Sequence, residues 1–275
     1  MKGNAFIIIT LVVFGFSCKN ENKRNITKET KEKEVAVSPA KALIMKMAQK
    51  VGTMQKLRAL KDVEYTYTFF NPSVGLKDVS TERYIFDGEL SWAKYNHHEA
   101  YVYAKEKGTV IQSQNGMDIW VSLEGELKTE AKDIGTTKFL REANFYWFTM
   151  MPKLLDKGLV YELMEDRVVA ATTYKIVKVT FNAGIGTVQD DFILYINPKT
   201  NLVDQFLFTV KGSRFPVPML MQVKYEIVAG IYLMTKRKVY KASWDGVIDG
   251  SPLLEQYSEN IKFNNGFTAE MFSSK

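Results

Sequence analysis

Hydrophobic and polar positions alternate in steps of two along much of the chain after residue 61. The clearest run alternates Val63, Tyr65, Tyr67 and Phe69 with Glu64, Thr66 and Thr68. Successive side chains of a strand point to opposite faces, so this pattern predicts a strand with one buried face. Similar segments occupy 82–86, 90–95, 100–104, 109–114, 117–123, 159–163, 173–181, 188–196, 202–210, 220–228, 231–243 and 254–263.

Short turn signals separate these segments. They are Asp87-Gly88, Lys107-Gly108, Asn115-Gly116, Glu124-Gly125, the run 197–201 and Ala229-Gly230. Asn115-Gly116 is the strongest hairpin signal, because both residue types accept a positive φ. Short connections favour an antiparallel meander of about 11–12 strands over βαβ units. No repeat of about 20–50 residues is visible, which argues against a propeller or a solenoid.

The period changes to that of a helix between residues 136 and 157. Apolar residues follow the i, i+3, i+4, i+7 rule at Phe139, Leu140, Ala143, Tyr146, Trp147, Met150, Met151, Leu154 and Leu155. Between Ala143 and Met151 the helix is apolar on almost every side, so it must be enclosed or contact an apolar surface. Pro152 predicts two short helices or a bent one. We expect this element to plug or cover a curved antiparallel sheet, in a mainly β (α+β) fold with an open β-barrel.

A second helix is predicted ahead of the strands. Ser38 and Pro39 are an N-cap and first-turn pair, and Gly52 interrupts the run that follows. Its apolar positions include Ala42, Leu43, Met45, Met47, Met54, Leu57 and Leu60. Methionine suits an adaptable packing surface, although core packing is its commoner role.

The first residues have the pattern of an export signal. Lys2 precedes an apolar run at 5–16, whose length of about twelve residues is short of the about 20 that a spanning helix needs. Gly15, Phe16, Ser17 and Cys18 resemble a bacterial lipobox, in which the cysteine is acylated and becomes the first mature residue. The usual box has Leu in place of Gly15 and a small or aliphatic residue in place of Phe16. The alternatives are an ordinary signal peptide with an incidental cysteine, or a weak membrane anchor.

Composition divides the chain further. Cys18 is the single cysteine, so no intrachain disulfide can form. Residues 19–37 are almost free of apolar side chains and predict a solvated tether. We therefore expect a signal peptide at 1–17, a lipidated cysteine with its tether at 18–37, and a single domain at 38–275. The net charge of +6 comes from interspersed charges of both signs, which gives no reason to expect nucleic-acid binding.

The chain resembles the LolA/LolB lipoprotein-carrier fold, and more closely a group of bacterial lipoproteins of unassigned function related to it. The resemblance rests on Tyr146-Trp147 with Met151-Pro152, on the closing segment 257–264, and on the N-x-G-F-x-x-x-x-F pattern from Asn264 to Phe272. It covers most of 39–272. In that fold an open β-barrel encloses a hydrophobic cavity under helical lids and receives acyl chains. Lys19, where an Asp is associated with inner-membrane retention, implies an outer-membrane protein facing the periplasm.

A hydrophobic pocket is the candidate site. We expect it to be lined by Tyr146, Trp147, Met150, Met151, Phe192, Phe206, Phe208, Met221 and Tyr225. In a partly open barrel these side chains would hold a lipid or an acyl chain; in a closed barrel they would simply fill the interior. The apolar loop 215–219 would lie at the rim or pack back onto the domain.

Other candidate sites are weaker. His97 and His98 should point to opposite faces of a strand or lie in an exposed turn, so we expect no metal site. Asp190 and Asp191 should likewise diverge and be solvated rather than act as acid and base. Gly184-Ile185-Gly186 lacks the third glycine of a nucleotide-binding loop, and 244–250 is typical of turns. Neither a G-x-S-x-G nor an H-E-x-x-H motif occurs, and we expect no cofactor.

Three functional hypotheses follow, in order of preference. The first is an envelope lipoprotein, anchored through Cys18, that binds a hydrophobic ligand and could receive it from a carrier. The second is a structural or partner-binding lipoprotein with a filled barrel, whose protein partner the sequence does not identify. An enzyme is the third and least favoured.

Overall fold

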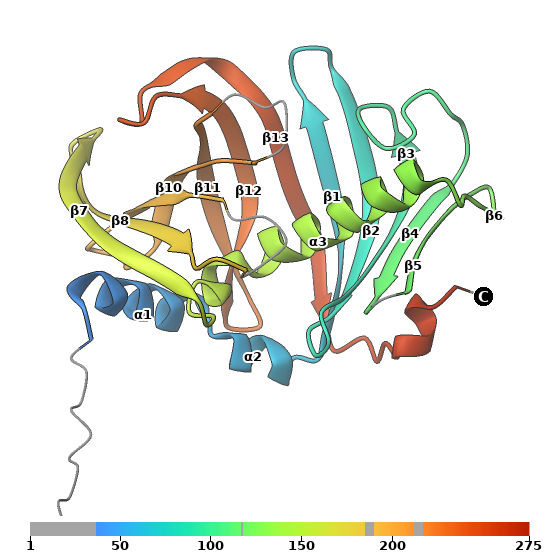
Figure 1. Cartoon of the computed structure of the whole chain (residues 1–275), viewed down its shortest axis with the longest axis horizontal. Helices are drawn as coiled ribbons and strands as arrows, with labels where there is room; N and C mark the ends of the chain where they lie inside the picture. Colours follow the sequence, from blue (N-terminus) through green and yellow to red (C-terminus); the bar gives the residue numbers. More distant parts are fainter. Residues whose placement is uncertain (1–36, 117, 185–189, 212–216, 275) are drawn as a thin grey trace, which may run out of the picture. The chain divides into compact units, whose positions relative to one another are not determined.

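One antiparallel sheet makes up most of the structure, a computed structural model that describes residues 37–116, 118–184, 190–211 and 217–274 (Figure 1). Its 13 strands lie in the order β6-β5-β4-β3-β2-β1-β13-β12-β11-β10-β9-β8-β7. Strands consecutive in the chain are neighbours, except β6 and β7, which α3 separates, and β1 also pairs with β13. Within the described residues β6 and β7 are the two edges, so the sheet is curved but not closed. The predicted antiparallel, mainly β fold is confirmed, with 13 strands in place of 11–12.

The strands before the central helix form a meander, as do those after it. The first group is β1 (Asp62–Asn71), β2 (Leu76–Ile85), β3 (Leu90–His98), β4 (Val110–Asn115), β5 (Asp118–Leu123) and β6 (Glu126–Leu127). The second is β7 (Leu159–Val169), β8 (Thr172–Phe181), β9 (Phe192–Ile196), β10 (Val203–Phe208), β11 (Met219–Val228), β12 (Ile231–Ala242) and β13 (Ile248–Phe263). The predicted hairpin at Asn115-Gly116 is confirmed, because it joins β4 to β5 and Gly116 has φ 61°.

The predicted strand at 100–104 is wrong. This segment forms turns, and the buried carboxylate of Asp78 holds it in place. That carboxylate accepts hydrogen bonds from the backbone N–H groups of Ala100 at 2.7 Å, Tyr101 at 3.0 Å and Val102 at 2.9 Å. Backbone donors that would have paired with a neighbouring strand are thus satisfied by one side chain, and the chain turns instead.

The predicted N-terminal helix is present, and the expected interruption at Gly52 divides it into two short helices. α1 (Pro39–Val51) begins after Ser38, whose Oγ accepts a hydrogen bond from the Lys41 N–H at 3.3 Å. Gly52 separates α1 from α2 (Met54–Ala59) and has φ 116°. A Cβ at this position would lie 2.6 Å from Ile231 Cδ1, so both conformation and space call for glycine. A short 3-10 helix, η1 (Ala269–Phe272), follows the last strand.

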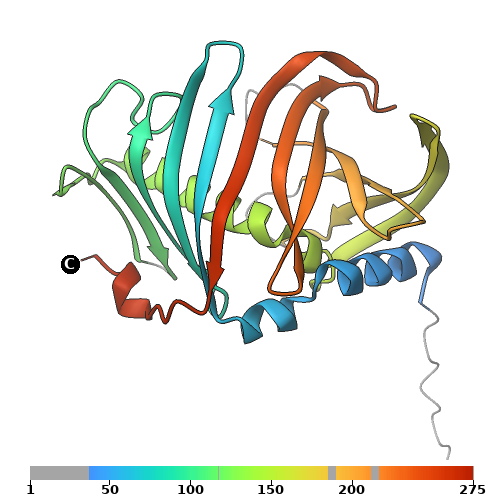
Figure 2. The same cartoon turned by 180° about the vertical axis from the view of Figure 1, so that it is seen from behind.

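The central helix α3 (Ala131–Lys153) crosses the concave face of the sheet, which Figure 2 shows from behind. It is one helix, so the prediction of two short helices or a bent one at Pro152 is wrong. Pro152 lies in the last turn, where it removes the N–H that would pair with the Phe148 carbonyl, and the helix ends one residue later. The most deeply buried stripe of α3 is Thr137, Arg141, Phe145 and Thr149, at intervals of four. The helix therefore presents a partly polar face to the sheet and apolar flanks on either side.

Candidate functional site

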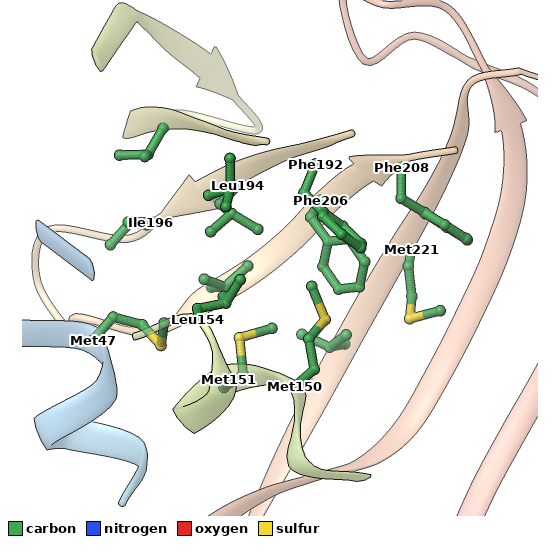
Figure 3. Close-up of a cluster of buried hydrophobic side chains, with 14 of the residues drawn as sticks. Met47, Met150, Met151, Leu154, Phe192, Leu194, Ile196, Phe206, Phe208 and Met221 are labelled. Carbon is green, nitrogen blue, oxygen red and sulfur yellow. The ribbon is translucent and has the colours of Figure 1, made fainter. Parts of the chain in front are cut away.

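The predicted ligand-binding residues lie together in the largest hydrophobic cluster, beneath the C-terminal half of α3. Met150, Met151, Phe192, Phe206, Phe208 and Met221 are buried, and Tyr146, Trp147 and Tyr225 are partly buried against them. Figure 3 shows Met150 and Met151 of α3 and Leu154 just after it beside Met47 of α1, opposite the strand residues Phe192, Phe206 and Met221. The side chains of this cluster fill most of the space between them. The candidate site therefore consists of the hollows that remain beside α3.

The first hollow, which we call the inner pocket, lies between α3 and the concave face of the sheet. Its volume is about 130 Å³. Its lining is mostly apolar and comes from α3, the 101–102 segment, seven strands and Val210 just after β10 (Tyr67, Phe69, Asp78, Tyr95, Tyr101, Val102, Phe139, Leu140, Ala143, Asn144, Trp147, Phe208, Val210, Met219, Met221, Val239, Leu254, Gln256). A cavity of about 150 Å³ holds one benzene ring, so the inner pocket has room for part of one alkyl chain.

The second hollow, the side groove, runs along the other flank of α3 and has a volume of about 880 Å³. Apolar residues on its walls include Phe145, Tyr146, Leu159, Phe181 and Phe192, and charged residues such as Lys138, Lys153 and Lys157 lie on its lining as well. Ligand sites commonly enclose about 300–1,000 Å³, so the side groove has the size of a ligand site.

The two hollows share one wall. Phe139, Ala143 and Trp147, at i, i+4 and i+8 of α3, line both, as does Val210. Trp147 stacks on Phe206 with ring centroids 6.1 Å apart and meets Phe208 edge-on at 5.3 Å. The side chain of Ala143 is the smallest on this ridge, so the hollows adjoin there with the least obstruction.

The predicted residues divide between the hollows and the packing behind them. Trp147 lines both hollows, Tyr146 and Phe192 line the side groove, and Phe208 and Met221 line the inner pocket. Met150, Met151, Phe206 and Tyr225 are not in either lining. The Tyr225 hydroxyl instead donates a hydrogen bond to the Val203 carbonyl at 3.0 Å.

A buried ion pair fastens α3 to the sheet, and sequence reasoning missed it. Arg141 and Glu82 are both fully buried, with Nη1 and Oε2 2.6 Å apart. Glu82 also accepts hydrogen bonds from Ser80 Oγ at 2.8 Å and Tyr84 OH at 3.0 Å, and Arg141 Nη2 donates to Tyr95 OH at 2.7 Å. Two features of the sequence could have indicated this ion pair. Arg141 lies at helical spacing with Thr137, Phe145 and Thr149, and Glu82 lies on the inward face of β2.

Burial and pairing keep this network in one charge state. Burial raises the pKa of Tyr84 and Tyr95 well above the ordinary range, so their hydroxyls remain neutral donors and acceptors. For Arg141 burial is the largest single effect and lowers the pKa, but the charge of Glu82, the hydroxyls of Tyr95 and Tyr84 and the hydrogen bond to Glu82 together raise the pKa by more, so it is raised overall. Arg141 therefore keeps its charge, and its contact with Glu82 holds the helix in one position.

The mouth of the inner pocket is aromatic and exposed. Tyr101 and Phe139 both line it, with 52% and 43% of their surface exposed. The Tyr101 ring lies 6.4 Å from that of Phe69, and the Asp78 hydrogen bonds hold the Tyr101 backbone. Apolar surface at a pocket entrance is typical of sites that receive apolar ligands.

The histidines have structural partners. Both lie on β3, so the expectation of an exposed turn is wrong, and His98 is buried. The His98 ring nitrogens lie 3.2 Å from the Tyr103 carbonyl and 2.7 Å from the Gly108 carbonyl. His97 Nε2 lies 3.3 Å from Glu99 Oε2. The described residues hold no group of three or more His, Cys, Asp or Glu side chains placed to share a metal ion.

The remaining candidates serve local structure. Asp190 is half-buried, so the expectation that it is solvated is wrong: Oδ1 accepts hydrogen bonds from Thr209 Oγ1 at 2.9 Å and the Lys211 N–H at 2.7 Å. Burial raises its pKa. Asp191 pairs with Lys211 Nζ at 3.1 Å. At 243–247 the chain makes the β12–β13 turn, with Gly246 at φ 84°.

Several predictions concern residues outside the described part of the chain. They are the signal peptide 1–17, Cys18 with most of its tether, Ile185 and Gly186, and the loop residues Phe215 and Pro216. Val217, the next residue of that loop, is exposed. Among the described helices, none has the length and apolar character required to cross a membrane.

Comparison with solved structures shows the fold. The chain is similar to a DUF1329 family protein from Desulfovibrio piger ATCC 29098, with TM-score 0.54 and 16% identity over 86% of this chain and 98% of that one. A LolA superfamily protein from Nitrosomonas europaea is also similar, with TM-score 0.49 and 13% identity over 86% of this chain and 97% of that one. At these identities each likeness concerns the fold alone, and the DUF1329 family protein, with a TM-score of 0.54, is the structure that supports the predicted fold.

Comparison of sequences identifies the family and assigns no activity. None of the curated proteins matches the chain. Residues 37–217, which include α3 and most of the residues around both hollows, match a protein family. The chain belongs to the family described as "Family of unknown function (DUF6503)".

Proposed function

We propose that this protein binds a hydrophobic ligand, a lipid or an acyl chain, in the hollows on either side of α3. The observation that carries the proposal is the ridge of Phe139, Ala143 and Trp147, which separates two adjoining hollows of about 130 and 880 Å³. Withdrawal from a bilayer costs an acyl chain about 0.8 kcal/mol per CH₂, and burial of the same carbons along this ridge would offset that cost.

We further propose an envelope location, with an anchor through acylated Cys18 and the body facing the periplasm at the outer membrane. The basis is the apolar run 5–16 followed by Cys18 and a polar tether. A tethered protein is better placed to receive a ligand than to carry it between membranes, so the proposed role is that of an acceptor.

The proposed role is binding and transfer without catalysis. The buried carboxylates near the hollows are already occupied: Glu82 by Arg141 and three further donors, and Asp78 by three backbone N–H groups. A carboxylate so fully hydrogen-bonded is a poor general base.

Native mass spectrometry of the protein isolated from its own host tests the proposal. We expect the wild-type chain to carry bound lipid. The Ala143→Leu variant should lose most of it, because a larger side chain on the shared ridge obstructs both hollows. Lys132→Leu, at an exposed position of α3 that lines neither hollow, is the matched control and should retain the lipid.

The thermal midpoint of each variant shows whether it is folded. Lipid retained by folded Ala143→Leu, or a wild-type chain that carries none, would contradict the proposal. The second result would favour the other hypothesis, a partner-binding lipoprotein with a filled interior.

A further inference from the structure

The concave wall of the sheet carries a group of polar side chains whose hydrogen-bonding atoms are unused. Thr235, Arg237 and Gln256 are 2%, 3% and 7% exposed. Thr235 Oγ1, Arg237 Nε and Gln256 Oε1 have no hydrogen-bond partner among the described residues. Buried polar groups are nearly always paired, so a group of three on adjacent strands calls for an explanation.

This group borders the inner pocket. Arg237 on β12 is the direct cross-strand partner of Gln256 on β13, and Gln256 lines the pocket. Val239, two residues along the same face of β12, lines it too. The guanidinium of Arg237 lies 5.7 Å from the centre of the Tyr67 ring, another lining residue. Arg237 is not itself in the lining of the pocket, but it lies directly beside the lining residues Gln256 and Tyr67.

The charge of Arg237 lacks a direct counter-ion. Within the described part of the chain no carboxylate lies within 4.0 Å of it, in contrast to Arg141 and its 2.6 Å contact with Glu82. Asp78 is the carboxylate that lines the pocket. It lies three strands from Arg237 in the same row of cross-strand partners, at roughly 14 Å, and it already accepts three backbone hydrogen bonds. An arginine keeps its proton inside proteins, so this buried charge is left to be matched from outside.

We propose that Arg237, with Gln256 and Thr235 beside it, binds the anionic head group of a single-chain amphiphile whose alkyl chain lies in the inner pocket. The planar guanidinium suits the paired oxygens of a carboxylate or a phosphate, and the Gln256 amide adds a donor. Val239, Leu254 and Met221 adjoin this end and would contact the first carbons of the chain. The remainder would pass Ala143 into the side groove. This inference rests on the proposed function, since it requires a chain in the pocket.

Equilibrium binding to the full chain, held in an amphipathic polymer, tests the inference. The probes are palmitic acid, the uncharged alcohol of the same length, and a lysophospholipid with a phosphate head and one palmitoyl chain. The variants are Arg237→Met, which keeps an apolar stem of similar length, and Arg237→Lys, which restores the charge. Lys236→Met is the matched control, because Lys236 is adjacent in β12 but exposed.

We expect wild type to prefer an anionic probe to the alcohol. Arg237→Met should weaken binding of that probe at least tenfold and change binding of the alcohol less than twofold. Arg237→Lys should recover part of the loss, and Lys236→Met should change nothing. A larger loss for palmitate than for the lysophospholipid would identify the head group as a carboxylate, and the reverse would identify it as a phosphate. The thermal midpoint of unliganded Arg237→Met should equal or exceed that of wild type, because an unpaired buried charge has been removed.

Two outcomes would overturn the inference and they differ from each other. If Arg237→Met weakens acid and alcohol equally, or weakens neither, the head-group assignment is wrong while hydrophobic binding stands. If wild type binds none of the three probes, both the head-group assignment and the proposed function are wrong.

Discussion

At the scale of single residues, a few buried polar side chains decide how α3 meets the sheet. Arg141 and Glu82 form a pair that is fully removed from water and joined to the hydroxyls of Tyr84 and Tyr95. Such a pair adds little net stability over an apolar one, yet removing one partner leaves the other charge buried and unpaired. The pair instead fixes one position of α3, and thereby the position of the ridge between the hollows.

We predict that Arg141→Met lowers the free energy of unfolding by about 3–5 kcal/mol, because Glu82 would lose its counter-ion. Lys138→Met on the same helix removes a surface charge 3.9 Å from Glu142 and should cost less than about 1 kcal/mol. Urea denaturation of both variants is the measurement. Equal, small losses would mean that the buried pair does not hold the helix.

We also predict a loss of stability at alkaline pH through Tyr67. Burial raises the pKa of Tyr67 from 10.0 to about 12. Between these values the unfolded chain has released the proton and the folded chain retains it. The stabilising contribution of the protonated Tyr67 hydroxyl is therefore complete below pH 10 and is lost as the pH rises to 12. This contribution amounts to roughly 2–3 kcal/mol. Between pH 10 and 12 the free energy of unfolding of the Tyr67→Phe variant should therefore fall by roughly 2–3 kcal/mol less than that of wild type. An unchanged slope would show that burial of this hydroxyl is not what holds its proton.

At the scale of elements, the alternation of side chains predicted most strands but not the segments whose structure depends on distant partners. The 100–104 segment has strand-like residues, and only the Asp78 carboxylate, distant in sequence, makes it turn. The β7–β8 turn has Ala170 at φ 43° and Ala171 at φ 64°, without the glycine or asparagine that marks such turns. The apolar flank of α3 was visible in the sequence, whereas the helix period gave no indication that Thr137, Arg141 and Thr149 form a deeply buried stripe.

Two buried aspartates secure two separate loops, and each serves as a control for the other. Asp78 accepts hydrogen bonds from Ala100, Tyr101 and Val102, and Asp62 accepts them from the backbone of Asn265, Gly266 and Phe267. We predict that Asp78→Ala speeds amide exchange at 100–102 by tenfold or more and spares 265–267. Asp62→Ala should do the reverse. Faster exchange in both loops in either variant would indicate global destabilisation and contradict local control.

At the scale of the whole molecule, the chain is one curved sheet with α3 across its concave face (Figures 1 and 2). The meander and the covering helix could be predicted, because strand period, turn residues and helix period are local properties. The pairing of β1 with β13 joins residues such as Val63 and Phe263, and no local pattern specifies it. The same applies to the hollows: the apolar residues around them were identifiable, but the division between lining and packing depends on how Trp147 and Phe206 stack.

The most direct test of the central claim is photo-crosslinking with a fatty acid that carries a diazirine near its methyl end, followed by peptide mapping. We predict labels on the Phe139–Trp147 stretch of α3 and on strand residues that line the hollows, such as Phe192, Phe208 and Met221. Excess unlabelled fatty acid should suppress these labels. Labels confined to exposed outer positions such as Val168 and Ile227, or labels that excess ligand does not suppress, would contradict the account.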